Sequence, residues 1–189
     1  GRGKFTADLV PKDALHAVFL RSPVAAGMIS HLDCCNAKKA SDVISVLTAI
    51  DATEDGIANM IWTGGPVRED GGVTVDSPRP LLNRSEIRHL GEPLAMVIAK
   101  SKQAAADAVE LIDLNIEANE ALALTVDDML DGPLVWPGTA DNIASLHRLG
   151  DREVVEQALL ASAHVSHFEF NISKITACAM EMRNSIGFI

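Results

Sequence analysis

The residues that could do chemistry in this 189-residue chain form few close pairs. His164 and His167 are the one close pair of histidines. On a helix, side chains three residues apart share a face and could bind a metal ion. On a strand, the two rings would point to opposite faces. The apolar residues Phe168, Phe170 and Ile172 alternate with polar ones just after the pair, which predicts a strand and no metal site.

The cysteines and the glycine pairs indicate no reactive site either. Cys34-Cys35 is a vicinal pair in a predicted turn, without the C-x-x-C spacing or the basic neighbourhood that lowers a thiol pKa. The pairs Gly64-Gly65 and Gly71-Gly72 are not followed by the Lys-Ser or Lys-Thr of a phosphate-binding loop, and no strand-turn-helix pattern frames them. We therefore interpret them as loop glycines.

The acidic candidates for proton transfer each have a simpler structural interpretation. Helix capping explains Asp127-Asp128. Glu92 lies in a Gly-Glu-Pro turn, where a solvated residue is favoured over a buried acid. Glu181 and Arg183 are two residues apart and would form a structural ion pair on one strand face. With no Ser-His-Asp set, zinc-type cysteine set or dinucleotide fingerprint, we predict no catalytic, cofactor-binding or metal-binding residue in this chain.

Composition narrows the class of protein. A chain of 189 residues suits one domain, or one domain and part of another. The formal net charge of −10 argues against a nucleic-acid backbone or an anionic membrane as partner. No apolar run approaches the ~20 residues of a membrane helix. Three cysteines are too few for a disulfide framework, so a cytoplasmic location is expected.

The main folding unit is predicted between Ile87 and Glu117. Leu94–Ala99 is apolar on both parities, which predicts a strand covered on both faces. Ser101 is expected to cap a helix that begins at Lys102. A strand with one polar face then follows, because apolar and polar residues alternate from Ile112 onward. Four residues at helical spacing form the buried face of the helix: Ala105, Ala108, Val109 and Ile112.

The stretches before this unit are less regular. Buried strands are predicted at Leu15–Leu20 and Asp42–Thr48. Val24–Ile29 fits either a strand or a short helix. Asp51–Arg84 has no periodic pattern, so it is predicted to be a loop that is functional or that packs on another surface.

The stretches after the unit leave alternatives open. Ala118–Leu124 fits either a helix or an extended connector. A capping box at Thr125–Asp128 predicts a short helix through Leu130, followed by a loop that Trp136 anchors. Asp151 is expected to cap a further helix. The chain stops without a turn or polar tail, so we expect its last element to continue into a larger body.

Six stretches, taken in chain order, carry a family resemblance: GRGKFTADL (1–9), LHAVFLRSP (15–23), DVISVLTAID (42–51), the unit 87–117, GDREVVEQALLASAHV (150–165) and ITACAMEMRNSIG (175–187). Together they resemble the N-terminal part of the molybdopterin-binding large subunit of the xanthine dehydrogenase, aldehyde oxidase and carbon monoxide dehydrogenase family. The LRSP run, the hydrophobic-Gly-Glu-Pro turn with its helix, and the M-E-x-R-x-x-I run carry most of the resemblance.

The resemblance implies an α+β fold. Residues 15–142 would form an α/β-hammerhead domain after a lead-in segment at 1–14. Residues 150–189 would be the truncated beginning of a molybdenum-cofactor-binding domain. Enzymes of this family hydroxylate N-heterocycles or aldehydes, or oxidise carbon monoxide. Their electrons leave through iron–sulfur centres and FAD on other domains or subunits.

The chain departs from the family in ways that bear on function. Ala179 and Met182 stand where the family usually has the prolines of Pro-Met-Glu-Pro-Arg. The family's glycine-rich cofactor loops and glutamate base would lie beyond Ile189, so no family site residue maps onto this chain. Molybdopterin is therefore expected in the full-length subunit and not in this chain.

Two hypotheses of different classes follow. The first is a fragment of a molybdenum hydroxylase large subunit, a scaffold around the cofactor domain that is inactive alone. Its expected partners are the remainder of that subunit and the iron–sulfur and flavin subunits. The apolar face Phe168-Phe170-Ile172 also predicts self-association. The alternative is a standalone binding or assembly subunit of a split-gene molybdenum enzyme.

Overall fold

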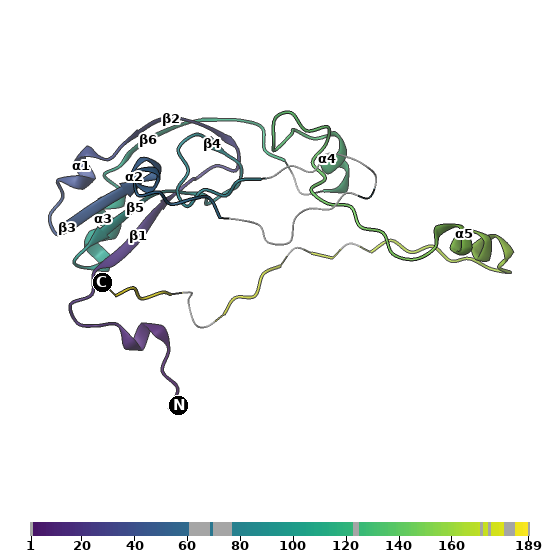
Figure 1. Ribbon diagram of the computed structural model, residues 1–189, viewed down its shortest axis with the longest axis horizontal. Coiled ribbons are helices and arrows are strands. Elements are labelled where there is room, and N and C mark those ends of the chain that lie inside the picture. Colours follow the sequence, from purple (N-terminus) through teal and green to yellow (C-terminus); the bar gives the residue numbers. More distant parts are fainter. Residues whose placement is uncertain are drawn as a thin grey trace. The chain divides into compact units, whose positions relative to one another are not determined.

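The computed structural model describes residues 2–60, 69, 77–122, 125–170, 172–173, 175–179 and 184–188, with the backbone alone at 126–128. Contacts within the chain divide it into two units, Asp13–His147 and Gly1–Lys12 with Arg148–Ile189, which we describe separately. The elements are, in chain order, η1 (Thr6–Leu9), β1 (His16–Arg21), β2 (Gly27–Asp33), α1 (Cys35–Lys38), β3 (Val43–Thr48), α2 (Ala49–Glu54), β4 (Glu86–Ile87), β5 (Pro93–Ala99), α3 (Lys102–Val109), β6 (Asp113–Ala118), α4 (Val126–Asp131) and α5 (Arg152–Ala161) (Figure 1).

Two antiparallel sheets organise the described part of the unit Asp13–His147. The first has the order β1-β5-β3, so that β5 is its central strand. The second has the order β4-β2-β6, with β2 in the centre. Antiparallel sheets with separate helices make this an α+β fold, as predicted.

The core lies between the first sheet and α3, which runs beside β1 and β5 (Figure 1). Ala105 and Ala108 of α3 are fully buried, as are Ala95, Val97 and Ala99 of β5. Small side chains on both surfaces let the helix axis approach the sheet closely. The predicted stripe of small residues is therefore the helix face that packs on the sheet.

The predicted boundaries of this core unit are confirmed. Ser101 caps α3, because its side-chain oxygen accepts a hydrogen bond from the Ala104 N–H at 3.1 Å. In β6, Leu114 and Ile116 are half-buried, whereas Asp113 is exposed. This alternation is the period of a strand with one solvated face.

The predicted burial of the two outer strands is wrong. In β1 half-buried and exposed residues alternate, and Phe19 is 37% exposed. In β3 only Val46 is buried. Both are edge strands, and α3 packs against one face of the sheet, so apolar residues on the other face stay accessible. The expectation that Leu94–Ala99 is covered on both faces holds in part. Leu94, Ala95, Val97 and Ala99 are buried, whereas Met96 and Ile98 are half-buried.

Three stretches left open or predicted as loop are now assigned. Of the stretch 24–29, which fitted a strand or a short helix, residues 27–29 belong to the strand β2, and residues 24–26 form a bend before it. Residues 119–122 form a connector without helix. The predicted loop from Asp51 is wrong at its start, where α2 occupies Ala49–Glu54. A capping box stabilises α2: Ile50 N–H donates to Thr48 Oγ1, and Asp51 accepts from the Thr48 N–H.

The described part of the second unit contains η1, α5 and chain without regular secondary structure. Asp151 caps α5 as predicted, accepting a hydrogen bond from the Val154 N–H at 3.0 Å. The predicted strand at residues 168–172 is wrong for the described residues, which are not assigned to a strand and pair with no described strand. A strand requires a neighbour to bond its backbone groups, and alternating polarity alone cannot supply one. Phe168 and Phe170 are instead 73% and 81% exposed.

Candidate functional site

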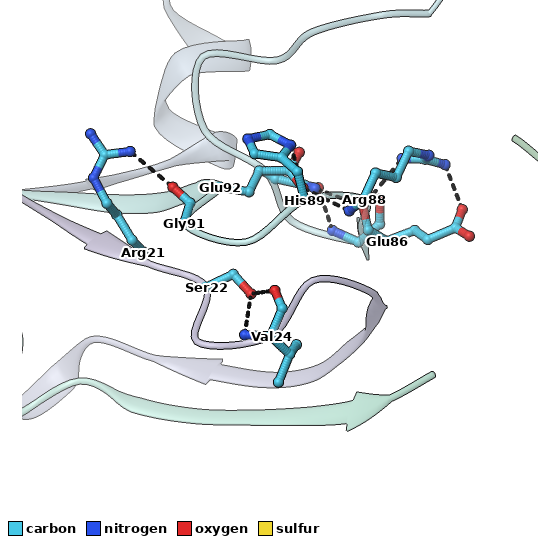
Figure 2. A network of polar contacts seen from close by, with 10 residues as sticks. Arg21, Ser22, Val24, Glu86, Arg88, His89, Gly91 and Glu92 are labelled. Carbon is cyan, nitrogen blue, oxygen red and sulfur yellow. Dashed lines mark hydrogen bonds and ion pairs between the residues drawn. The ribbon is translucent and has the colours of Figure 1, made fainter. Parts of the chain in front are cut away.

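Several hydrogen bonds hold the turn at residues 90–93 in the unit Asp13–His147. Gly91 has a φ of +78°, a left-handed conformation that glycine adopts without a steric penalty. Its N–H donates to the Ser22 carbonyl at 3.0 Å, and the Ser22 N–H donates to the Glu92 carbonyl at 2.9 Å. Arg21 adds a side-chain bond to the Gly91 carbonyl at 2.9 Å (Figure 2). The turn is thereby fixed to the end of β1.

Glu92 is buried, with 6% of its surface exposed, so the prediction of a solvated turn residue is wrong. Its carboxylate accepts a hydrogen bond from the Arg88 backbone N–H at 2.9 Å. The His89 Nδ1 atom lies 3.7 Å from the same carboxylate oxygen. These neighbours explain the burial, because a carboxylate can leave water when donors replace its hydration.

Arg88 joins the strand β4 to an aromatic ring. Its two terminal nitrogens donate to the carbonyl and the carboxylate of Glu86. The guanidinium carbon lies 3.9 Å from the centre of the Trp136 ring, which is a cation–π stack. The Nε atom of Arg88 is buried and has no hydrogen-bond partner among the described residues.

Asn83 fastens the segment before β4 to β5. The residue is buried, and its N–H donates to the Pro93 carbonyl at 2.8 Å. Its side-chain nitrogen donates to the Glu86 carbonyl at 2.7 Å, while its side-chain oxygen accepts from the Ser85 N–H at 3.0 Å. Asn83 is thus a structural residue whose backbone N–H and side-chain amide hold the chain.

Two cavities adjoin Arg88. The smaller has a volume of about 330 Å³ and lies among α2, the segment before β4, Arg88 and Trp136. The larger has about 490 Å³ and is lined mostly by apolar residues, among them Ala26, Ile87 and Leu134. Charged residues also line the larger cavity, namely Glu86, Arg88, His89 and Glu120.

The larger cavity does not fit molybdopterin, whose phosphate requires free cations or close backbone N–H groups. In the larger cavity two carboxylates face one guanidinium, and that guanidinium is already paired with Glu86. Among the described residues, the smaller cavity is lined by two cations, Arg84 and Arg88, and by no glycine, so it lacks only the close backbone approach of a phosphate loop.

The vicinal cysteines have the environment of unreactive thiols. Cys34 is buried just before α1, and desolvation raises its pKa. Cys35 is exposed, and its hydrogen bond to the Asp33 side chain raises its pKa, as does the charge of Asp33. A raised pKa reduces the thiolate fraction at neutral pH. The predicted turn is wrong only in its second half, since Cys35 begins α1.

The other residues singled out from the sequence lie in α4, in the second unit or outside the described residues. His164 Nε2 lies 3.1 Å from Ser166 Oγ, on an exposed segment of the second unit. Asp127-Asp128 lies in α4, and the glycine pairs at 64–65 and 71–72, with Glu181 and Arg183, lie outside the described residues. Within the described ranges, no three His, Cys, Asp or Glu side chains gather as a metal site would need. None of the helices described there has the length and apolar character needed to cross a membrane.

Sequence reasoning missed Arg88 and Glu86 and treated Trp136 as a purely apolar anchor. Arg88 and Trp136 are 48 positions apart, and no local pattern predicts that they meet. A usable signal did exist for α2, where Thr48 and Asp51 have the spacing of a capping box.

Comparison with known sequences shows that this chain is similar to parts of molybdenum enzymes. Residues 1–120 match the family described as aldehyde oxidase and xanthine dehydrogenase, a/b hammerhead domain. The large subunit of nicotine 6-hydroxylase from Paenarthrobacter nicotinovorans is 30% identical over 191 residues, which are 99% of this chain and 22% of that protein. The large chain of carbon monoxide dehydrogenase from Afipia carboxidovorans is 24% identical, over 96% of this chain and 23% of that one. The chain thus spans about a fifth of the length of these curated relatives.

Solved structures show the same fold. Quinoline 2-oxidoreductase from Pseudomonas putida 86 superposes with a TM-score of 0.65 and 29% identity, over 76% of this chain and 18% of that chain. A copper- and molybdenum-containing carbon monoxide dehydrogenase superposes with a TM-score of 0.67 and 23% identity, over 86% of this chain and 21% of that chain. In both, the matching part is a minor share of a much longer polypeptide.

Proposed function

We propose a function on the premise that this chain belongs to the aldehyde oxidase and xanthine dehydrogenase family of molybdenum hydroxylases, whose a/b hammerhead domain it matches over residues 1–120. The chain is part of a molybdenum hydroxylase large subunit. It acts as a scaffold that packs beside the cofactor-binding part of that subunit, and its own residues carry out no complete reaction.

The observation that carries the proposal is the alignment with nicotine 6-hydroxylase, which uses 99% of this chain and 22% of that protein. The geometry of the described residues agrees with a supporting role. The polar groups around Glu92 bond to one another, and Asn83 bonds the backbone, so both are engaged in holding the fold. The larger cavity is lined mostly by apolar residues, and its one guanidinium is paired with Glu86.

The proposed domain organisation follows the family. Residues 15–142 form the hammerhead domain, and residues 150–189 begin the molybdenum-cofactor domain. Exposed apolar residues on α5, among them Val154, Val155 and Leu160, support this division, because an amphipathic helix is stable when its apolar face is covered. The rest of the large subunit is the proposed cover.

The proposed partners are those of a multi-subunit molybdenum enzyme in the cytoplasm. They are the remainder of the large subunit, together with iron–sulfur and flavin subunits. Molybdopterin would be bound by the remainder and not by this chain. In isolation, exposed Phe168, Phe170 and Ile172 would drive self-association instead.

Co-expression tests the proposal. This chain is produced with and without the polypeptide that supplies the rest of its large subunit, and each sample is analysed by size-exclusion chromatography. We expect self-association alone and a stoichiometric complex with the complementary polypeptide. A chain that stays monomeric at all concentrations and does not bind that polypeptide would contradict the proposal. A stable complex formed by a separately encoded short chain would instead favour a split-gene subunit.

A further inference from the structure

The smaller cavity combines two guanidinium groups with the absence of acidic neighbours. It has a volume of about 330 Å³, and both Arg84 and Arg88 line it. Among the described residues that line this cavity, none is an aspartate or a glutamate. The whole chain has a formal net charge of −10, so the cavity reverses the prevailing sign locally. A concave surface lined by charge of one sign attracts a ligand of the opposite sign.

The two guanidinium groups differ in what already binds them. The terminal nitrogens of Arg88 donate to the carbonyl and the carboxylate of Glu86, as Figure 2 shows, so its charge is paired. The Arg84 side chain is exposed and forms no hydrogen bond or ion pair with another described residue. A guanidinium offers a planar fork of donors that matches a carboxylate. Arg84 is therefore the group in this cavity that can receive an anion.

The backbone on both sides of Arg84 is held in place. The Asn83 N–H donates to the Pro93 carbonyl of β5 at 2.8 Å, and the Ser85 carbonyl accepts from the Ile29 N–H of β2 at 2.9 Å. The point from which the Arg84 side chain extends is thus fixed to both sheets. An anchored backbone reduces the conformational entropy that a cation loses when it binds a ligand.

The remaining walls of the cavity suit an organic molecule. Ser85 and Asn59 line it and bring a hydroxyl and an amide, both of which can donate to a carboxylate. Ile57, Leu81 and Trp136 supply apolar surface. Sites for small molecules usually have ~300–1,000 Å³ with mostly apolar walls and a few polar groups, so this cavity suits a small ligand. The absence of a lining glycine favours a carboxylate over a phosphate.

We propose that the smaller cavity binds a small organic carboxylate, with Arg84 pairing with the charged end and Trp136 contacting the apolar body. Arg88 acts through space. Its Nε atom is buried without a hydrogen-bond partner among the described residues, so a nearby anion stabilises a charge that water does not reach. The site uses residues of the unit Asp13–His147 alone, and it does not rest on the proposed scaffold role.

NMR titration of the full chain with three probes tests the site. Benzoate has a carboxylate and an apolar body, benzamide has the same body without the charge, and inorganic phosphate has charge without the body. We expect benzoate to shift the amide signals of Arg84 and Ser85 and the indole signal of Trp136, with a Kd of about 1 mM. Benzamide and phosphate should bind about tenfold more weakly.

Each of three results would overturn the proposal. Benzoate that leaves these signals unshifted at about 10 mM would show that no such site exists. Benzamide that binds as tightly as benzoate would show that the charge is not recognised. Phosphate that binds as tightly as benzoate would show that the apolar walls do not contribute.

A pair of matched variants assigns the binding to Arg84. Arg84→Gln should weaken benzoate binding about tenfold, because the fork and its charge are lost. Arg79→Gln is the control: this arginine is also exposed and lies between Pro78 and Pro80, but it is not among the described residues that line the cavity. At about 0.15 M salt the control should change the Kd less than twofold. Equal weakening in the two variants would overturn the proposal, since general attraction by positive charge would then explain the binding.

Discussion

The Glu92 carboxylate accepts a hydrogen bond from the Arg88 backbone N–H at 2.9 Å and thereby closes the loop between β4 and β5. The same residue accepts a bond from the Ser22 N–H through its carbonyl. One buried glutamate therefore joins the end of β1 to the turn that starts the central strand. The Gly-Glu-Pro turn therefore has a structural role, which the sequence alone does not reveal.

Replacing Glu92 by leucine should lower the free energy of unfolding by about 1–3 kcal/mol, because the Arg88 N–H loses its acceptor. Glu92→Gln keeps an acceptor oxygen and should cost clearly less. Urea unfolding followed by circular dichroism measures both, with the exposed Glu110→Gln as control. Equal losses for the leucine and glutamine variants would mean that the hydrogen bond from the Arg88 N–H does not contribute to the free energy of unfolding.

Gly27 should not tolerate a side chain. A Cβ atom there would lie 2.6 Å from the Glu117 carbonyl oxygen, on the backbone of the paired strand β6. Gly27→Ala should destabilise the protein by about 1–3 kcal/mol, since the backbone must move. Thermal unfolding checks this against Gly3→Ala, where nothing lies within 4 Å. A Gly27→Ala protein as stable as the parent would show that β2 and β6 can separate freely.

The capping box of α2 predicts a pH dependence. Hydrogen bonds from the Thr48 side chain and backbone lower the pKa of Asp51 below its ordinary value of 3.8. A folded pKa below the unfolded one contributes stability that is present above the unfolded value and is lost as pH falls through the folded value. Asp51→Asn should therefore be less stable than the parent at pH 7, and the difference should shrink below about pH 4.

Unfolding titrations between pH 7 and pH 2 measure that difference. Glu54→Gln is the control, because it removes an exposed carboxylate from the end of the same helix. A stability difference for Asp51→Asn that stays constant down to pH 2 would contradict the assigned role of the cap.

The Asp33 side chain should suppress the reactivity of Cys35. Its hydrogen bond and charge raise the thiol pKa, so removing the charge should lower that pKa and increase the thiolate fraction. In a background of Cys34→Ala and Cys178→Ser, we expect Asp33→Asn to speed iodoacetamide labelling at pH 8 severalfold. Asp113→Asn serves as the control. Equal labelling rates for the two variants would show that Asp33 does not govern the thiol.

The elements that could be predicted are those with a local cause. Ser101 and the apolar stripe of α3 lie within one helix, so spacing alone locates them. The alternation in β6 is equally local, and the strand exists because β2 bonds it. The same alternation at residues 168–172 led to a wrong prediction, because no described strand pairs with these residues. Periodicity predicts which face of a strand is apolar, and pairing depends on a neighbour.

The candidate site was less predictable because its contacts are distant in sequence. Glu92 is buried through partners at Ser22 and Arg88, and the Ser22 contact spans 70 positions. Arg88 contacts Trp136, which lies 48 positions further along the sequence. Residues in turns are usually solvated. Only the folded structure shows that Glu92 of this turn is buried.

The most direct test of the central claim is the molybdenum content and hydroxylase turnover of the chain, purified alone and together with the rest of its large subunit. The scaffold account predicts no stoichiometric molybdenum and no turnover for the isolated chain, and molybdenum in the co-purified complex. One molybdenum per isolated chain, with turnover of an aldehyde or an N-heterocycle, would contradict it.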